Sequence, residues 1–289
     1  MRGVLFSNFL LAFANVLAAG TPEYDRAHEL YQRTEYEQTI AVLQPLPAKN
    51  IETLELLGQS YFMLGEYKKA ADSFEKAIAL VPPTHEQSSE LYHWLGRTFG
   101  RRAETATFLT APGHASKARQ MFERAVQLDP NNQEAVNDLF DYYLEAPGFL
   151  GGGIQKAEEL ARHIATLDAA EGHYAQAQIK ERRKEYQAAE DHLRRAAELA
   201  PKQVGRVLDL AKYLATRGRL SESDAMFQQA FRVAPGSPKV LFARAEAYVR
   251  QNRNLGEARV LLEQYLKSTL TPEDPPRQQA EEMLRKIQR

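Results

Sequence analysis

The feature that most constrains the fold of this 289-residue chain is a spacing of apolar and small residues that recurs along it. The clearest copy reads Leu54, Leu57, Gly58, Tyr61, Gly65, Ala70, Phe74, Ala77 and Pro82. Related copies start near residues 20, 51, 89, 133, 170, 204 and 238, so the last two intervals are 34 residues each. A pattern that repeats at this period indicates an array of similar structural units.

Each unit predicts two packed helices. Leu54, Leu57 and Tyr61 recur at helical spacing and define an apolar face, and a second such face follows from residue 70. The small residue Gly58 lets the two helices approach closely, and Pro82 cannot continue a helix. Because one hairpin cannot cover its own apolar face, neighbouring hairpins must stack. We therefore predict an all-α, right-handed α-solenoid of about seven hairpins, not the two globular domains that length alone suggests.

The order Leu-Gly, Tyr, Ala, Phe and Pro within each unit resembles the tetratricopeptide repeat (TPR). The resemblance extends over nearly all of the chain after the N-terminal segment. It implies a non-enzymatic scaffold that binds a protein or peptide partner, of unidentified sequence, on its concave face. Residues 142–153, which read YYLEAPGFLGGG, are also similar to a segment found in a subset of bacterial exported TPR proteins.

In TPR proteins, the first helix of each unit lines the concave face. This resemblance, carried over position by position, implies that the partner contacts Tyr31, Gln59, Phe62, Met63, His93, Arg97, Arg101, Asn137, Asp141, Tyr174, Gln178, Lys212, Phe242 and Glu246. The set mixes aromatic, amide and charged side chains, and aromatic residues and Arg often anchor interfaces. The Lys and Asn order with which some TPR domains clamp a C-terminal carboxylate is not present, so we do not expect that binding mode.

Two units carry extra residues between their helices. Residues 99 and 118 are 19 apart and residues 143 and 157 are 14 apart, whereas the clearest copy has 9. Both insertions contain Ala-Pro-Gly, which breaks a helix and turns the chain. They form either helix-end turns or a lip over the groove, and in the second case a nearby pocket could bind a small molecule or lipid. The residues concerned are Phe108, Pro112, Gly113, Pro147, Gly148, Phe149, Gly151, Gly152 and Gly153.

The two ends of the chain differ from the repeats. Arg2 precedes an uncharged, apolar run over residues 4–19 that is shorter than the roughly 20 residues of a membrane span. Small residues follow it, as at a signal-peptidase site. We predict an export signal at 1–19, a solenoid at 20–269 and a capping helix at 270–289. The protein would then be periplasmic or secreted; the alternatives for residues 4–19 are a membrane anchor or a packed first helix.

Composition and motifs argue against several functions. The formal net charge of -1 gives no basic excess for nucleic-acid binding, so no nucleic-acid partner is expected. The absence of cysteine excludes disulfides, thiol nucleophiles and cysteine zinc sites. The chain has no His-Glu-x-x-His pair, phosphate-binding loop or Gly-x-Ser-x-Gly motif. We therefore predict no catalytic residue, cofactor or metal, and interpret Glu159 and His163, four residues apart, as a solvent-exposed contact.

Overall fold

The computed structural model describes residues 21–82 and 88–287, and these form an α-solenoid without strands. The first helices of the seven hairpins are α1 (Pro22–Gln32), α3 (Ile51–Met63), α5 (Ser88–Thr105), α7 (Gln133–Glu145), α9 (Ala169–Arg182), α11 (Val204–Thr216) and α13 (Pro238–Arg250). The second helices are α2 (Tyr36–Leu43), α4 (Tyr67–Ile78), α6 (Ala111–Leu128), α8 (Ile154–Leu167), α10 (Tyr186–Leu199), α12 (Leu220–Val233) and α14 (Leu255–Lys267). The predicted fold class is confirmed, and each first helix begins within two residues of its predicted start. The predicted export signal lies outside the described residues.

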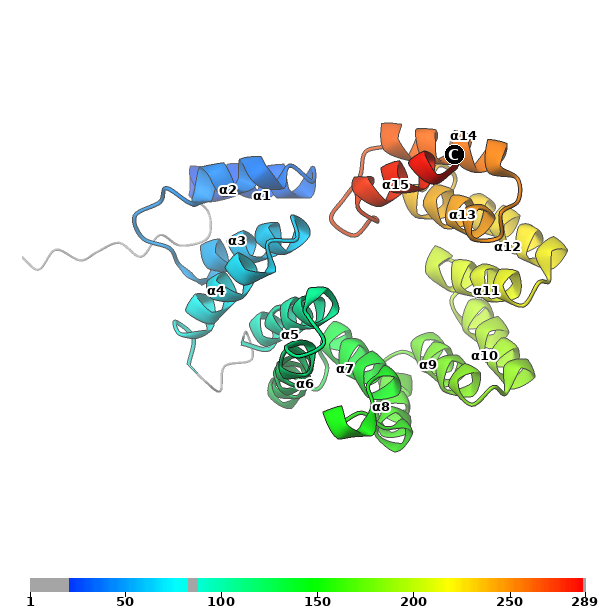
Figure 1. Cartoon of the computed structure of the whole chain (residues 1–289), viewed down its shortest axis with the longest axis horizontal. Coiled ribbons are helices and arrows are strands. Elements are labelled where there is room, and N and C mark those ends of the chain that lie inside the picture. The colour runs from blue at the N-terminus through cyan, green and yellow to red at the C-terminus, as the bar shows by residue number, and fades with distance from the viewer. Residues whose placement is uncertain (1–20, 83–87, 288–289) are drawn as a thin grey trace, which may run out of the picture.

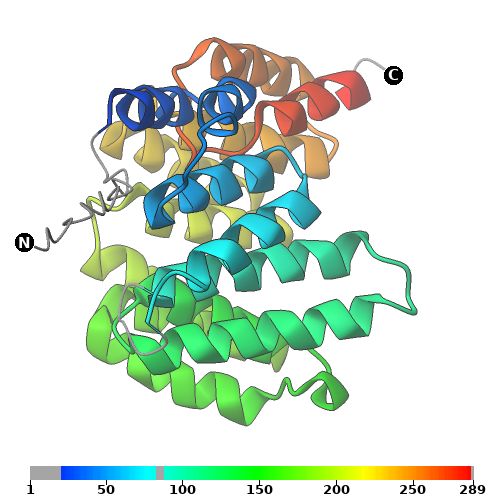
Figure 2. The ribbon, with the colours of Figure 1, turned by 90° about the vertical axis from the view of Figure 1, so that its left-hand side faces the viewer.

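The hairpins follow one another around a curved array (Figure 1). The helices α3, α5, α7, α9, α11 and α13 lie toward the inside of the curve, and their partner helices lie outside (Figure 1). The array bends so far that its first and last units lie near each other, which Figure 2 shows from the side. Among the described residues, no helix has both the length and the apolar character needed to cross a membrane.

In the second and third hairpins, close packing of a phenylalanine on a glycine joins the two helices. A Cβ atom on Gly58 would lie 2.7 Å from the ring of Phe74, and one on Gly96 would lie 2.6 Å from Phe122. Phe74 is completely buried and Phe122 nearly so. The glycines therefore create the space that the aromatic rings fill, as the sequence pattern predicts.

Five of the described hairpins share one turn after their first helix. Thr34, Gly65, Lys184, Gly218 and Asn252 all have a positive φ between 50° and 75°. In each case the following residue donates its N–H to a carbonyl five residues back, such as Glu66 to Tyr61 at 2.9 Å. This left-handed ending caps the helix and redirects the chain. The two hairpins without it, α5–α6 and α7–α8, are those with the insertions.

The two insertions have different structures although they share Ala-Pro-Gly. In the third hairpin the extra residues lengthen both helices to 18 residues, so that the hairpin projects beyond its neighbours (Figure 2). The prediction that Pro112 and Gly113 are loop residues is therefore wrong. They lie in the first turn of α6, where Pro is well tolerated. In the fourth hairpin, Pro147 does end α7 and precedes the short 3-10 helix η1 (Gly148–Leu150).

Glycine is required where the second insertion folds back. Gly151 has a φ of 87°, and Gly153 has a φ of 157°. A Cβ on Gly152 would lie only 1.9 Å from the carbonyl oxygen of Ala146. The run of three glycines therefore allows a tight backbone turn, which supports its interpretation as a helix-end turn.

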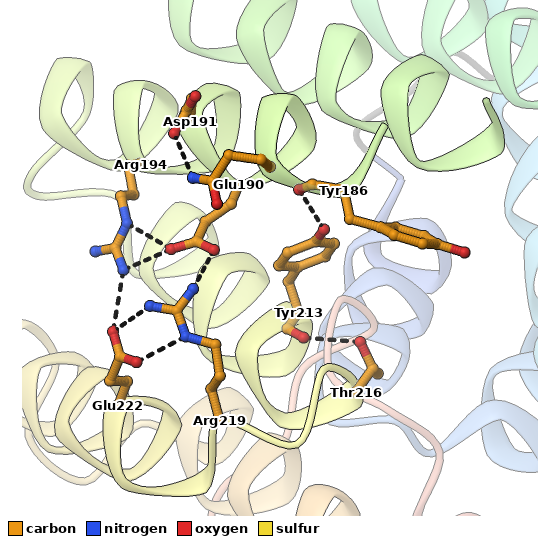
Figure 3. Close-up of polar contacts among 9 residues, drawn as sticks. Tyr186, Glu190, Asp191, Arg194, Tyr213, Thr216, Arg219 and Glu222 are labelled. Carbon is orange, nitrogen blue, oxygen red and sulfur yellow. Dashed lines mark hydrogen bonds and ion pairs between the residues drawn. The ribbon is translucent and has the colours of Figure 1, made fainter. Parts of the chain in front are cut away.

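A network of ion pairs joins the fifth and sixth hairpins (Figure 3). Glu190 of α10 is 5% exposed and accepts hydrogen bonds from Arg194 and Arg219. Glu222 of α12 in turn contacts both arginines, at 3.3 Å from Arg194 and at 2.7 Å from Arg219. Because both guanidinium groups are shared between two carboxylates, the buried charge of Glu190 is fully paired.

The last helix, α15 (Arg277–Ile287), packs on α13 and α14. Ala280 is completely buried, and Met283, Leu284 and Ile287 pack against the same apolar cluster. This arrangement covers the exposed side of the last hairpin, as a capping helix would.

We predict that Gly58→Ala lowers stability although alanine favours helix formation. The added methyl group would collide with Phe74, and overpacking of this kind typically costs about 1–3 kcal/mol. The control is Gly100→Ala in α5, where no atom lies within 4 Å of the new Cβ, so this variant should gain about 1 kcal/mol. Chemical unfolding followed by circular dichroism measures both variants. Equal midpoints for the two would contradict the packing argument.

Candidate functional site

The concave side of the first four hairpins contains a groove of about 1100 Å³. One wall consists of the inner helices α1, α3, α5 and α7 together with the start of α4. The other wall is the segment between α14 and α15, residues 271–276, with Gln279. The groove thus lies between the two ends of the solenoid, which approach each other in Figure 1.

Most residues expected on the concave face of these hairpins do line the groove. They are Tyr31, Gln59, Phe62, Met63, His93, Arg97, Arg101 and Asn137. Asp141 accepts a hydrogen bond from Gln178, which lines a separate cavity of about 390 Å³ with Arg182 and Arg217. The structure therefore divides the expected surface into two regions.

The expected residues of the last three hairpins are placed differently. Phe242 is 5% exposed and packs on Tyr265 at a ring distance of 5.2 Å, so the expectation that it contacts a partner is wrong. Glu246 pairs with Arg250 at 2.9 Å, and Tyr174 packs under Arg206 at 4.4 Å. Neither of these two, nor Lys212, lines the groove or the cavity beside Gln178.

An aromatic cluster forms the middle of the groove wall. The rings of Phe62 and Trp94 meet edge to face at 5.4 Å, and Tyr67 contacts Phe62 at 5.5 Å. The guanidinium of Arg97 lies 4.6 Å from the centre of the Trp94 ring, and Arg101 bonds to the Tyr67 hydroxyl at 3.2 Å. The cation–π contact of Arg97 and the hydrogen bond of Arg101 hold both arginines against the wall. The wall therefore offers apolar ring surface bordered by positive charge.

Next to the aromatic cluster, polar side chains of α5 and α7 face each other. Asp138 contacts the His93 Nε2 atom at 2.8 Å and Arg97 at 3.7 Å. Within the described part of the chain, three buried atoms of this wall have no hydrogen-bond partner. They are Nδ1 of His93, Nε1 of Trp94 and Oδ1 of Asn137. Buried polar atoms are usually paired, so unpaired ones mark a place for a ligand.

The groove continues into a smaller cavity of about 210 Å³ between α1 and α3. Its lining includes the carboxylates of Glu52 and Glu55 together with Tyr24 and His28. Burial raises the pKa of Glu55 to about 7, with further contributions from the nearby charges of Glu90 and Glu52. This end of the groove would therefore favour a cationic group, because a positive charge stabilises the ionised carboxylate.

The wall opposite the helices is an ordered turn. Asp274 accepts hydrogen bonds from the backbone N–H and the hydroxyl of Thr271, at 2.9 and 3.0 Å. Glu273 pairs with Lys239 of α13 at 3.1 Å, and the Tyr265 hydroxyl donates to the carbonyl of Pro275. The last hairpin thus fixes the segment in place, and proline restricts its backbone further.

Sequence analysis missed some of the groove residues. It did not assign Tyr67, Glu90, Trp94, Glu134 or Asp138 to the concave face, and it placed residues 271–276 in the capping helix, whereas α15 begins only at Arg277. A lone tryptophan and the dense prolines of Pro272, Pro275 and Pro276 were visible signals. Their meeting in one groove depends on the curvature of the whole array.

The tips of the insertions point into solvent. Phe108, Leu109 and Phe149 are 83%, 76% and 82% exposed. None of them lines the groove, the smaller cavity between α1 and α3 or the cavity beside Gln178. The tips therefore form neither a lip of the groove nor the wall of any of these cavities.

Three tetratricopeptide repeat profiles match the chain, over residues 51–83, 170–203 and 208–275. The matched residues correspond to α3–α4, to α9–α10 and to most of α11–α14. The chain is a tetratricopeptide repeat protein. The TPR resemblance of the sequence is thereby confirmed, and TPR arrays are repeat scaffolds that typically bind proteins and are generally not enzymes.

Solved TPR structures share the fold. A TPR protein of Parabacteroides merdae has a TM-score of 0.57 at 14% identity, covering 92% of this chain and 98% of its own. A thermophilic TPR protein of Thermus thermophilus has a TM-score of 0.53 at 19% identity, covering 66% and 97%. The Cut9–Hcn1 hetero-tetramer of the APC/C has a TM-score of 0.50 at 15% identity, covering 91% and 48%. A comparison with curated proteins finds no match.

We predict that Glu55→Gln raises the thermal midpoint at pH 8 and has little effect near pH 5. The folded TPR array holds the pKa of Glu55 at about 7, above its ordinary 4.5, so ionisation of this carboxyl opposes folding at high pH. That unfavourable contribution disappears as the pH falls from about 7 toward 4.5, because the folded state then keeps its proton. Differential scanning calorimetry across this range measures it. The control is Glu75→Gln on the exposed face of α4; an equal pH profile for both variants would contradict the prediction.

Proposed function

We propose that this TPR array binds an extended segment of a partner protein in the groove between α1, α3, α5, α7 and residues 271–276. The main observation that supports this proposal is the groove of about 1100 Å³. It combines an aromatic wall, amide side chains and unpaired buried polar atoms. A peptide in extended form suits such a site, because its backbone offers donors and acceptors along its whole length.

The groove predicts the character of the bound segment. An apolar or prolyl side chain would pack on Phe62 and Trp94, whose rings are part of the wall. The amides of Gln59 and Asn137 would bond to the peptide backbone. A lysine, arginine or amino terminus would enter the smaller cavity near Glu55, where a cation lowers the cost of ionising the buried carboxyl.

The alternative function is binding of a small molecule or lipid in a pocket beside the insertion tips. It has no supporting observation, because Phe108 and Phe149 are exposed and line neither the groove nor the two smaller cavities. The groove itself is bordered by charged residues on both walls, such as Arg97 and Glu273. A protein segment, which carries charges of its own, matches this border better than a lipid chain does.

Site-specific photocrosslinking in the native host tests the proposed groove. A photoreactive residue at Met63 lies inside the groove, whereas one at Val260, which is 50% exposed on α14, serves as a surface control. We expect Met63 to capture one defined partner segment that Val260 does not capture. The double change Phe62→Ala and Arg97→Glu should abolish that product while leaving the helical circular dichroism signal intact. The same products from both positions would contradict the proposal.

We further propose that the protein is exported through the segment at residues 4–19. The support is the sequence pattern alone, an uncharged apolar run after Arg2 and small residues behind it. Cell fractionation combined with N-terminal sequencing tests this, and the expected mature protein begins near residue 20 outside the cytoplasm. Recovery of a chain with Met1 in the cytoplasmic fraction would rule out a cleaved signal.

A further inference from the structure

Three potential metal ligands converge on the inner side of α5 and α7. Glu90 and His93 lie three residues apart on α5 and therefore share one face of that helix. Glu134 comes from the first turn of α7. One ligand atom from each of the three residues lies within 4.8 Å of the others. The three side chains also line the groove described above.

His93 shows that this cluster is more than a group of surface acids. Its side chain is 1% exposed, and its Nε2 atom lies 2.8 Å from a carboxylate oxygen of Asp138. An ionised carboxylate can only accept, so Nε2 carries a proton, and in the neutral imidazole Nδ1 then presents a lone pair. That Nδ1 atom is buried without a hydrogen-bond partner among the described residues, and the nearest oxygen of Glu90 is 4.0 Å away.

The result is three acceptors that face one another. Asn132 donates a long hydrogen bond to Glu90 at 3.4 Å. This bond does not involve His93, whose Nδ1 atom stays unpaired. Like groups in such an arrangement repel each other, and a cation between them would satisfy all three at once. In natural metal sites, a carboxylate commonly bonds to the second nitrogen of the ligating histidine and orients its ring. Asp138 occupies that place beside His93.

We propose that Glu90, His93 and Glu134 bind a divalent transition-metal ion, with Zn²⁺ as the best match. One imidazole nitrogen and two carboxylate oxygens form a ligand set that suits zinc. Metal–ligand distances of about 2.0–2.2 Å require the two carboxylates to move inward. Glu90 is half-buried and Glu134 is exposed, so both side chains are free to do so, whereas His93 is held by its packing.

An ion bound at this site would have two effects. It would tie the third hairpin to the fourth, because its ligands come from α5 and α7. Three protein ligands leave a further coordination position for water or for a donor atom of a ligand. That position would face the groove, since all three ligands line it. The metal site goes beyond the proposed function, and its test requires no partner.

Titration of the purified full chain with Zn²⁺ tests the proposal. Isothermal titration calorimetry should show one site, and Zn²⁺ should raise the thermal midpoint because it binds only the folded chain. Co²⁺ should give the visible absorption of a bound ion. Mg²⁺, which favours oxygen ligands and octahedral geometry, should have little effect.

The variant Glu134→Gln removes one ligand from an exposed position, so folding should be preserved. We expect its Zn²⁺ affinity to fall at least about tenfold, by analogy with the effect of lost supporting groups at metal sites. The matched control is Glu37→Gln, an exposed first-turn glutamate of α2. Glu90→Gln should behave like Glu134→Gln. No Zn²⁺ binding by the natural chain, or equal binding by it and Glu134→Gln, would overturn the proposal.

Discussion

The close approach of the two helices within each hairpin is the constraint on which the array depends, and in the second and third hairpins a phenylalanine packed on a glycine achieves it. Phe74 fills the space that Gly58 leaves, and Phe122 does the same at Gly96. This close approach sets the distance between inner and outer helices. Stacking of neighbouring hairpins then builds the curved solenoid from units of this kind. The groove exists because that curvature brings the first and last units together.

Variation within the array appears where the repeat geometry is relaxed. Five hairpins share the left-handed turn after their first helix, and the two that lack it carry the insertions. One insertion lengthens its helices, and the other forms a compact glycine turn. Identical Ala-Pro-Gly strings thus have different structures, because Pro is equally compatible with the first turn of a helix and with the end of one.

The groove brings together groups from distant parts of the chain. Its aromatic residues come from the first three hairpins, its polar residues from the first four, and its far wall from the segment before α15. Residues 271–276 thereby have two roles, since they lead into the capping helix and also narrow the groove. The proposed peptide site and the proposed metal site share the groove wall formed by α5 and α7, where Asp138 contacts both His93 and Arg97. A bound metal would change the charge that a peptide meets there.

The sequence by itself determined the hairpins, their number and their inner faces, because these follow from local helical periodicity and a repeated spacing. For the first four units it also identified groove residues such as Phe62 and Arg97. It could not predict that Phe242 is buried, that Pro112 starts a helix, or that Glu134 lies beside His93. These outcomes depend on how far each helix extends and on the accumulated rotation between stacked hairpins. Only the tertiary structure decides such quantities, since they arise from packing between units and not from the pattern within one.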